Sequence, residues 1–251
     1  MTLDRYTRWQ AAPIHLGISA GIAAVVVATM LLLWYPRPYF QAAGGQTLLL
    51  LLIGVDVVVG PLLTLIVFDT RKKHLVLDLA VIAMLQCGAL AYGAMIMFNA
   101  RPVYVAFAGD RFELVEANAI DKNNLAQALP AFRELPLTGP KVVGSRLPDN
   151  ARELDDLRMA TLFGVSLGAF PQHFVPYASQ SRQVLAQAKP LAKLRGKHPE
   201  AASEIDRVVG ASGMAEGELR YLPLQARLGD MAVIVDGTSG AVHGVAAVDP
   251  W

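Results

Sequence analysis

Apolar residues gather in three long runs within the first hundred positions of the chain. The runs cover about residues 13–35, 47–68 and 75–98, and polar loops separate them. A helix rises about 1.5 Å per residue, so each run is long enough to cross the hydrocarbon core of a bilayer. The first run exceeds the apolar core of a signal peptide, and no Ala-x-Ala cleavage site follows it. The pattern therefore predicts an N-terminal domain, residues 1–100, of three transmembrane α-helices.

From residue 101 the pattern changes to short segments bounded by turn residues. Val103–Ala108 and Arg111–Glu116 are strand-like, and the Gly-Asp pair between them is typical of a β-hairpin. A helix is expected to begin at Asp149 or Asn150, where a glutamate three residues on would complete a capping box. The overall prediction is a membrane protein in which three transmembrane α-helices precede a small α+β extracytoplasmic domain, residues 101–251.

The charged loop residues predict the orientation. Arg5 and Arg8 precede the first apolar run, and Arg71–Lys73 follow the second, whereas the loop between these runs holds only Arg37. Basic residues are enriched in cytoplasmic loops. We therefore expect a multi-pass protein of a bacterial inner membrane with a cytoplasmic N-terminus. Three crossings then leave the α+β domain in the periplasm.

Composition narrows the classes of partner. Hydrophobic residues make up 54% of the chain and charged residues only 17%, with a formal net charge of +1. Soluble domains are about 25% charged, so the lipid bilayer is an expected partner. The near-neutral charge argues against nucleic-acid binding. Cys87 is the single cysteine, so an intrachain disulfide is excluded.

Two polar residues fall near the middle of the apolar runs. Asp56 lies in the second run and Gln86 in the third, at similar depths if consecutive helices are antiparallel. An acid within hydrocarbon costs about 2.5–3.5 kcal/mol on insertion scales, so it normally has a partner or a task. The main expectation is an interhelical hydrogen bond between these residues. A contact with a partner's transmembrane helix and a proton or ion relay are the alternatives.

Three further residues are candidates for packing or partner binding. Gly60 and Pro61 follow Asp56, and the proline should kink its helix because it removes a backbone donor. Asp78 lies near the start of the third run, close to basic loop residues, which favours interfacial ion pairing. Small residues recur at four-residue spacing in the first run, beginning at Gly17 and Gly21, and could form a close-packing helix face.

The sequence contains no catalytic set. None of its histidines has a second histidine at the spacing of metal ligands. A Gly-x-Ser-x-Gly motif, a phosphate loop and a dinucleotide fingerprint are all missing. We therefore expect a protein that is not an enzyme and that needs no cofactor and no metal.

Three ordered motifs carry a family resemblance. The first is RWxAxxIHLGIS from Arg8, the second is VDVVVGPLLTLIVF from Val55, and the third is DLAVIAMLQCGALAYG from Asp78, followed by RPVYVAFAGDRFELV. Together they resemble the TfpX/TfpZ family of type IV pilin accessory proteins, which is related to the fimbrial assembly proteins called FimB. The resemblance is dense over about the first 115 residues. Positions that match the family pattern are Asp56, Gly60, Pro61, Asp78, Gln86, Tyr92, Gly93, Pro102, Asp110, Arg111 and Phe112.

The resemblance implies an inner-membrane accessory protein for type IV pilus biogenesis. Its expected partners are a type IV pilin and, as a further candidate, the pilus assembly machinery. On this hypothesis Asp56 or the small-residue face of the first helix meets the pilin helix, and the periplasmic domain meets the pilin head. The alternatives are a membrane-bound pilin-modifying enzyme and a periplasmic sensor held by membrane helices.

Overall fold

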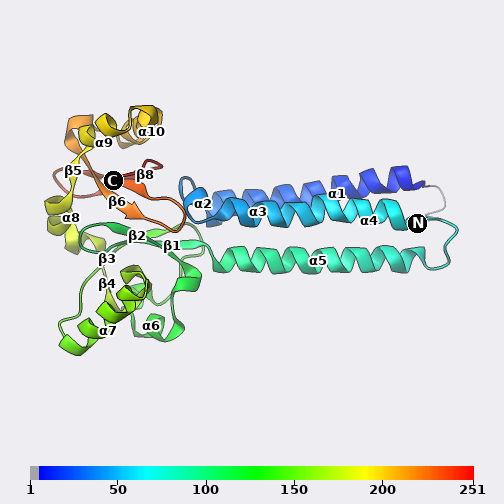
Figure 1. Ribbon diagram of the computed structural model, residues 1–251, viewed down its shortest axis with the longest axis horizontal. Helices are drawn as coiled ribbons and strands as arrows, with labels where there is room; N and C mark the ends of the chain where they lie inside the picture. Colours follow the sequence, from blue (N-terminus) through cyan, green and yellow to red (C-terminus); the bar gives the residue numbers. More distant parts are fainter. Residues whose placement is uncertain (1–5) are drawn as a thin grey trace. The chain divides into compact units, whose positions relative to one another are not determined.

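The computed structural model describes residues 6–251 of the protein. Arg5, one of the charges behind the predicted orientation, lies outside this range. The chain divides into two compact units, each described here by itself. The first comprises the chain up to Leu33 together with Gly45–Asn99, and the second comprises Trp34–Gly44 together with Ala100–Trp251. Figure 1 labels most of the helices and strands of both units.

The described part of the first unit consists mainly of three helices long and apolar enough to span a membrane, as the sequence predicted. They are Arg8–Trp34, Gly45–Val67 and Leu75–Asn99. The first consists of α1 (Arg8–Thr29) and a π-helical segment, Met30–Trp34. The second consists of α3 (Gly45–Ile53), a π-helical segment, Gly54–Val59, and α4 (Gly60–Val67). The third is α5 (Leu75–Asn99).

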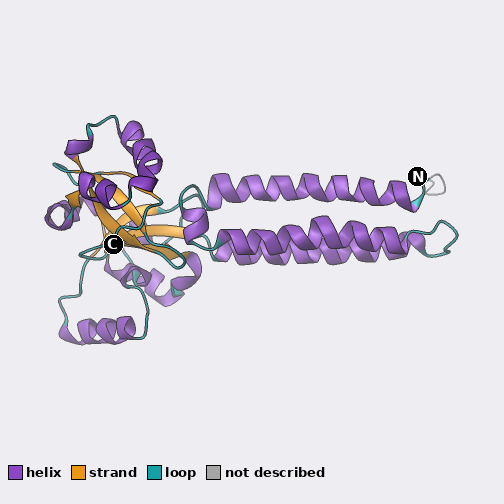
Figure 2. Cartoon of the chain, turned by 45° about the horizontal axis from the view of Figure 1, so that its top comes forward, coloured by secondary structure: helices purple, strands orange, loops and turns teal. Residues whose placement is uncertain are grey.

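The three long helices run side by side, with α4 packed against both α1 and α5 (Figure 2). Their outer faces are apolar and exposed, as in Leu32 (76%), Val76 (68%) and Ile66 (66%). Soluble proteins rarely expose contiguous apolar surface on this scale. These faces therefore fit an environment of hydrocarbon or of another protein.

The connection between the first and second long helices belongs to the second unit. It contains the short helix α2 (Tyr39–Ala42), and Ala42 is buried in the core of the sheet domain. The backbone N–H of Leu228 donates to the carbonyl of Ala42 at 3.0 Å, and Arg227 Nη2 donates to the carbonyl of Ala43 at 2.7 Å. A segment that reads as a polar loop is thus built into the fold of residues 100–251.

A mixed eight-stranded sheet forms the centre of the second unit, in agreement with the predicted α+β class. Its strand order is β4-β3-β1-β2-β6-β7-β8, and β5 pairs with β6. The β1–β3 and β2–β6 pairs are parallel and the others are antiparallel. The strands are β1 (Pro102–Phe107), β2 (Phe112–Glu116), β3 (Lys141–Ser145), β4 (Phe174–Val175), β5 (Lys189–Pro190), β6 (Leu219–Gln225), β7 (Met231–Asp236) and β8 (Val242–Ala246).

Helices cover both faces of the sheet. Because side chains alternate along each strand, successive residues pack against helices on opposite faces. On β7, Val233 and Val235 pack with α8 (Ser181–Gln187) and α2, whereas Ala232 and Ile234 pack with α9 (Leu191–Lys197) and α10 (Ala202–Ser212). The remaining helices are α6 (Lys122–Gln127) and α7 (Ala151–Leu162). Short 3-10 turns occur at Ala117–Ala119, Pro130–Phe132, Leu167–Ala169, Pro171–His173, Tyr177–Gln180, Pro199–Ala201 and Glu216–Glu218.

The predicted hairpin is confirmed, since β1 and β2 pair antiparallel with Phe107 opposite Phe112. The helix expected near residue 150 is also present. Its N-cap is Asn150, whose side chain accepts from the N–H of Arg152 at 2.9 Å, so an Asx cap takes the place of the expected capping box.

Candidate functional site

Four of the five residues that the sequence singled out lie together where the second and third long helices meet. Asp56 belongs to the π-helical segment Gly54–Val59, Gly60 and Pro61 open α4, and Gln86 approaches them from α5. We call these four residues the GP cluster. The fifth residue, Asp78, lies elsewhere on α5.

A missing backbone donor explains the GP cluster. In the π-helical segment the N–H of Gly60 bonds to the carbonyl of Val55, five residues back. In the same register the carbonyl of Asp56 would bond to the N–H of residue 61, but Pro61 has none. Gln86 fills the gap, because its Nε2 donates to this carbonyl at 3.2 Å. An unmet carbonyl in an apolar surrounding would otherwise cost the full desolvation penalty.

Gly60 supplies the space that this hydrogen bond needs. A Cβ at this position would overlap the amide of Gln86 and would lie 2.5 Å from its Cδ. The sequence predicted a hydrogen bond between Gln86 and Asp56, and the structure brings the two residues together. The acceptor is the backbone carbonyl of Asp56, and its carboxylate is left for other contacts.

The Asp56 side chain is only 5% exposed, and its Oδ1 has no hydrogen-bond partner among residues 6–251. It lines a groove of about 240 Å³ between the second long helix and α5. Leu52 and Gly93 meet at the groove, where a Cβ on Gly93 would overlap Leu52. An unpaired carboxylate beside apolar side chains is a costly arrangement, which marks the groove as a candidate recognition site.

The first long helix is connected to this face by another polar contact. His15 Nδ1 lies 2.5 Å from Thr64 Oγ1, and Thr64 is 3% exposed. Thr64 was not among the residues that the sequence indicated. The signal was present, because Asp56, Gly60 and Thr64 recur at four-residue spacing and therefore share one helix face.

Gly17 and Gly21 of the first helix do not pack against other residues in the described part of the chain. A Cβ on Gly17 or Gly21 would meet no atom within 4 Å, and both glycines are exposed. Asp78, by contrast, makes the kind of pair expected of it, since Lys72 Nζ lies 3.4 Å from its Oδ2. Both side chains are more than one third exposed, so this pair adds little stability.

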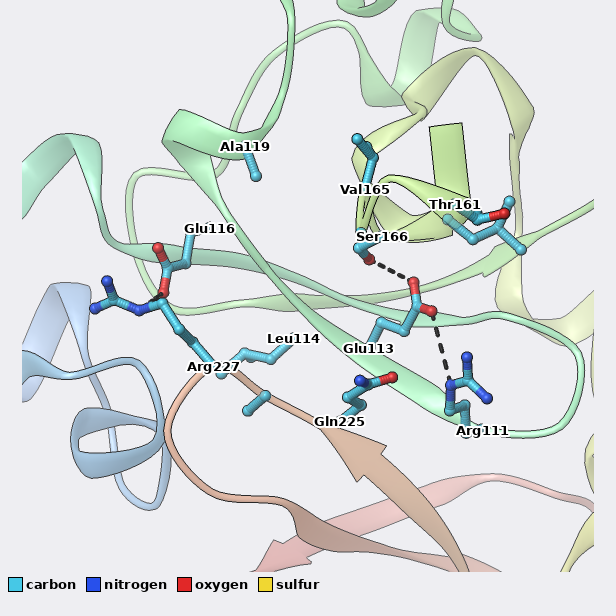
Figure 3. Close-up of a pocket in the computed structure, with 13 residues that line it drawn as sticks. Arg111, Glu113, Leu114, Glu116, Ala119, Thr161, Val165, Ser166, Gln225 and Arg227 are labelled. Carbon is cyan, nitrogen blue, oxygen red and sulfur yellow. Dashed lines mark hydrogen bonds and ion pairs between the residues drawn. The ribbon is translucent and has the colours of Figure 1, made fainter. Parts of the chain in front are cut away.

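The sheet domain has a polar cleft of about 400 Å³, which the sequence did not predict (Figure 3). Glu113 of β2 is its buried acid. Glu113 Oε2 accepts hydrogen bonds from Ser166 Oγ at 2.5 Å and from the N–H of Gly168 at 2.7 Å, and Arg111 Nε lies 3.8 Å from Oε1. Gly168 has to be small, because a Cβ there would lie 2.5 Å from Val115 Cγ2.

A second ion pair crosses the same cleft. Arg227 Nε lies 3.2 Å from Glu116 Oε1. Burial raises the pKa of the Glu116 carboxyl, and the Arg227 guanidinium partly opposes this by lowering it. Since Arg227 also bonds to the carbonyl of Ala43, the pair fastens the connector Trp34–Gly44 to the edge of β2.

The charged groups of the cleft are therefore already paired with each other. Within residues 6–251, no three His, Cys, Asp or Glu side chains are grouped so that they could hold a metal ion. The cleft carboxylates fix a loop and a connector. Several buried side-chain atoms of the described residues lack a hydrogen-bond partner, among them Arg111 Nε and Glu116 Oε1 of the cleft, but Asp56 Oδ1 is the one that lies in the helical unit.

Enlarging Gly60 should displace the Gln86 amide. We expect Gly60→Ala to lower the free energy of unfolding by about 1–3 kcal/mol, the usual cost of overpacking. Gly54→Ala is the matched control in the same helix, because its Cβ meets nothing within 4 Å. The measurement is unfolding of the micelle-bound protein by increasing SDS, followed by circular dichroism. Equal stability of the two variants would contradict the steric role of Gly60.

The role of Pro61 can be tested by returning the missing donor. Gln86→Leu should destabilise the protein by about 1–3 kcal/mol, because the carbonyl of Asp56 loses its partner. When Pro61→Ala is also present, the new N–H of residue 61 can donate to that carbonyl. Gln86→Leu should then destabilise the protein less. A double-mutant cycle in the SDS assay measures this coupling, which we expect to exceed about 0.5 kcal/mol. Simple additivity would rule the proposed compensation out.

Comparison with known proteins agrees with the family resemblance. A family model described as "Fimbrial assembly protein FimB" matches residues 4–44. Two proteins of Dichelobacter nodosus match most of the chain. The "Fimbrial assembly protein, serogroup I" is 32% identical over 230 residues, which is 89% of this chain and 88% of the relative. The "Fimbrial assembly protein, serogroup E1" is 30% identical over 227 residues, which is again 89% of this chain and 88% of the relative.

A third relative covers a shorter part. The "Fimbrial assembly protein, serogroups C1 and C2" of the same organism is 35% identical over 117 residues, which is 46% of this chain and 89% of that protein. No solved structure matches the chain. The first two matches include both the helical unit and the sheet domain. On this evidence the chain belongs to the FimB family of fimbrial assembly proteins.

Proposed function

We propose that this protein is a multi-pass inner-membrane accessory factor for type IV pilus assembly, which contacts a pilin before or during its polymerisation. The observation that carries the proposal is the match to fimbrial assembly proteins over 89% of the chain. Because the match includes both units, the assembly role is assigned to the helices and the sheet domain acting together.

The connector Trp34–Gly44 supports one topology. It is folded into the sheet domain, so the loop after the first helix and the chain after the third helix must lie on the same side of a membrane. This agrees with three crossings. The loop on the other side carries Arg71–Lys73, and basic loops face the cytoplasm. The sheet domain is then periplasmic.

The chemistry of the molecule favours recognition over catalysis. The cleft charges are paired with each other, and the GP cluster satisfies a backbone carbonyl. A pilin held in the inner membrane offers one apolar helix and one periplasmic head. This chain offers exposed apolar helices and a folded domain, so it can meet both parts of such a subunit.

The topology can be tested with single cysteines. After Cys87→Ala, we introduce Gln41→Cys in the connector, Ser239→Cys in the sheet domain and Thr70→Cys in the basic loop, all at exposed positions. A membrane-impermeant maleimide should label residues 41 and 239 in intact spheroplasts and residue 70 only after lysis. Labelling of residue 41 and residue 239 from opposite sides would contradict the proposed topology.

The assembly role is tested by deleting the gene in the producing bacterium. We expect a loss of surface pili of at least tenfold, counted by electron microscopy and restored by the intact gene. The intact mass of the pilin should be unchanged. A change in mass would favour a pilin-modifying enzyme, and unchanged piliation would overturn the proposed function.

A further inference from the structure

The starting point is the buried carboxylate that the fold leaves without a partner. Asp56 is 5% exposed and its Oδ1 accepts no hydrogen bond from any residue in the described part of the chain. Gln86, the partner that the sequence predicted for Asp56, donates instead to the backbone carbonyl of Asp56. A polar group in an apolar environment is costly until it is hydrogen-bonded.

The groove beside Asp56 has the shape and surface to receive side chains from another helix. Its volume is about 240 Å³, and the second long helix and α5 form its two walls. Among its lining residues only Asp56 and Tyr92 carry a side-chain oxygen. Tyr92 is 63% exposed at the rim. The small residue Gly93 lets the two walls approach closely at Leu52.

We propose that this groove binds a transmembrane helix of the partner protein, and that this helix places an uncharged hydrogen-bond donor, a hydroxyl or an amide, on the Asp56 carboxyl. The proposal rests on the proposed function, which makes the partner a pilin. It assigns the contact to the Asp56 groove, in preference to the exposed small-residue face at Gly17 and Gly21.

The chemistry of the groove selects this occupant. A lipid tail would fill the apolar volume, but it has no donor for Asp56. A partner ammonium would pair with the acid, but its own transfer into hydrocarbon would carry a large desolvation cost. A hydroxyl or an amide donates to a carboxylate at a much smaller desolvation cost, and a hydroxyl also accepts from a protonated carboxyl. Side chains on a membrane helix reach such a groove directly.

Photo-crosslinking in the producing bacterium tests the proposal. A benzophenone amino acid replaces Tyr92 at the groove rim in the full chain, and pilin adducts are detected with an antibody against the pilin of that bacterium. The matched control places the same probe at Cys87. Cys87 is exposed on α5 and lies roughly 140° around the helix axis from Tyr92. The Tyr92 probe should give at least fivefold more pilin adduct than the Cys87 probe.

Variants at Asp56 test the hydrogen bond itself. Asp56→Leu should lower the Tyr92 adduct at least fivefold, whereas Asp56→Asn keeps an oxygen acceptor and should stay within twofold of the parent. Leucine is favourable in a membrane helix, and Gln86 bonds to the backbone at residue 56. The membrane level of each variant is measured alongside. Ala89→Leu narrows the groove while Asp56 stays unchanged, and it should also lower the adduct.

Several outcomes would overturn the inference. They are equal adducts at the two probe positions, an Asp56→Leu adduct equal to the parent, an Asp56→Asn adduct as low as that of Asp56→Leu, and an adduct consisting of two copies of this chain. If pili are lost on gene deletion but neither probe captures pilin, the groove assignment fails and the assembly function stands. If deletion leaves piliation unchanged, the assembly function itself fails.

Discussion

The helical unit depends on one requirement, that every backbone carbonyl in an apolar environment finds a donor. Pro61 removes a donor from the second long helix, and the π-helical segment before it determines which carbonyl is left unmet. Gln86 of α5 provides the replacement, and Gly60 leaves space for it. One backbone defect thus specifies which faces of two helices meet. A polar interhelical bond of this kind is weak by itself, about 0.6 kcal/mol on average in a membrane, but it is directional in a way that apolar contacts are not.

The connector between the first two helices is the second constraint. Residues 34–44 supply Ala42 to the sheet core and two carbonyls to hydrogen bonds from Arg227 and Leu228. Folding of the sheet domain therefore requires the connector and residues 100–251 on the same side of any membrane that the helices cross. This requirement is independent of loop charge, and it fits three crossings in either orientation.

The two units treat their acids differently. In the sheet domain Glu113 and Glu116 each have a nearby arginine, and Glu113 also accepts two hydrogen bonds. These acids hold loops in place. In the helical unit the Asp56 carboxylate has an oxygen with no partner, although its surroundings are far less polar. Of the buried atoms of the described residues that lack a hydrogen-bond partner, Asp56 Oδ1 is the one in the helical unit, and for this reason the proposed partner contact is assigned to the helix groove.

Three ordered motifs pointed to the family, and the sequence alone determined the number and approximate extent of the apolar helices and the change to an α+β domain. These follow from local patterns, since helix length, alternation and turn residues are read within a few positions. It also brought Asp56 and Gln86 to one depth and marked Gly60 and Pro61. Only the tertiary structure decided that Gln86 bonds to a carbonyl, that Thr64 meets His15, and that residues 34–44 belong to the sheet domain. Each of these contacts joins segments that lie far apart in the chain. The residues of one segment do not specify which atom of the other segment will lie opposite them.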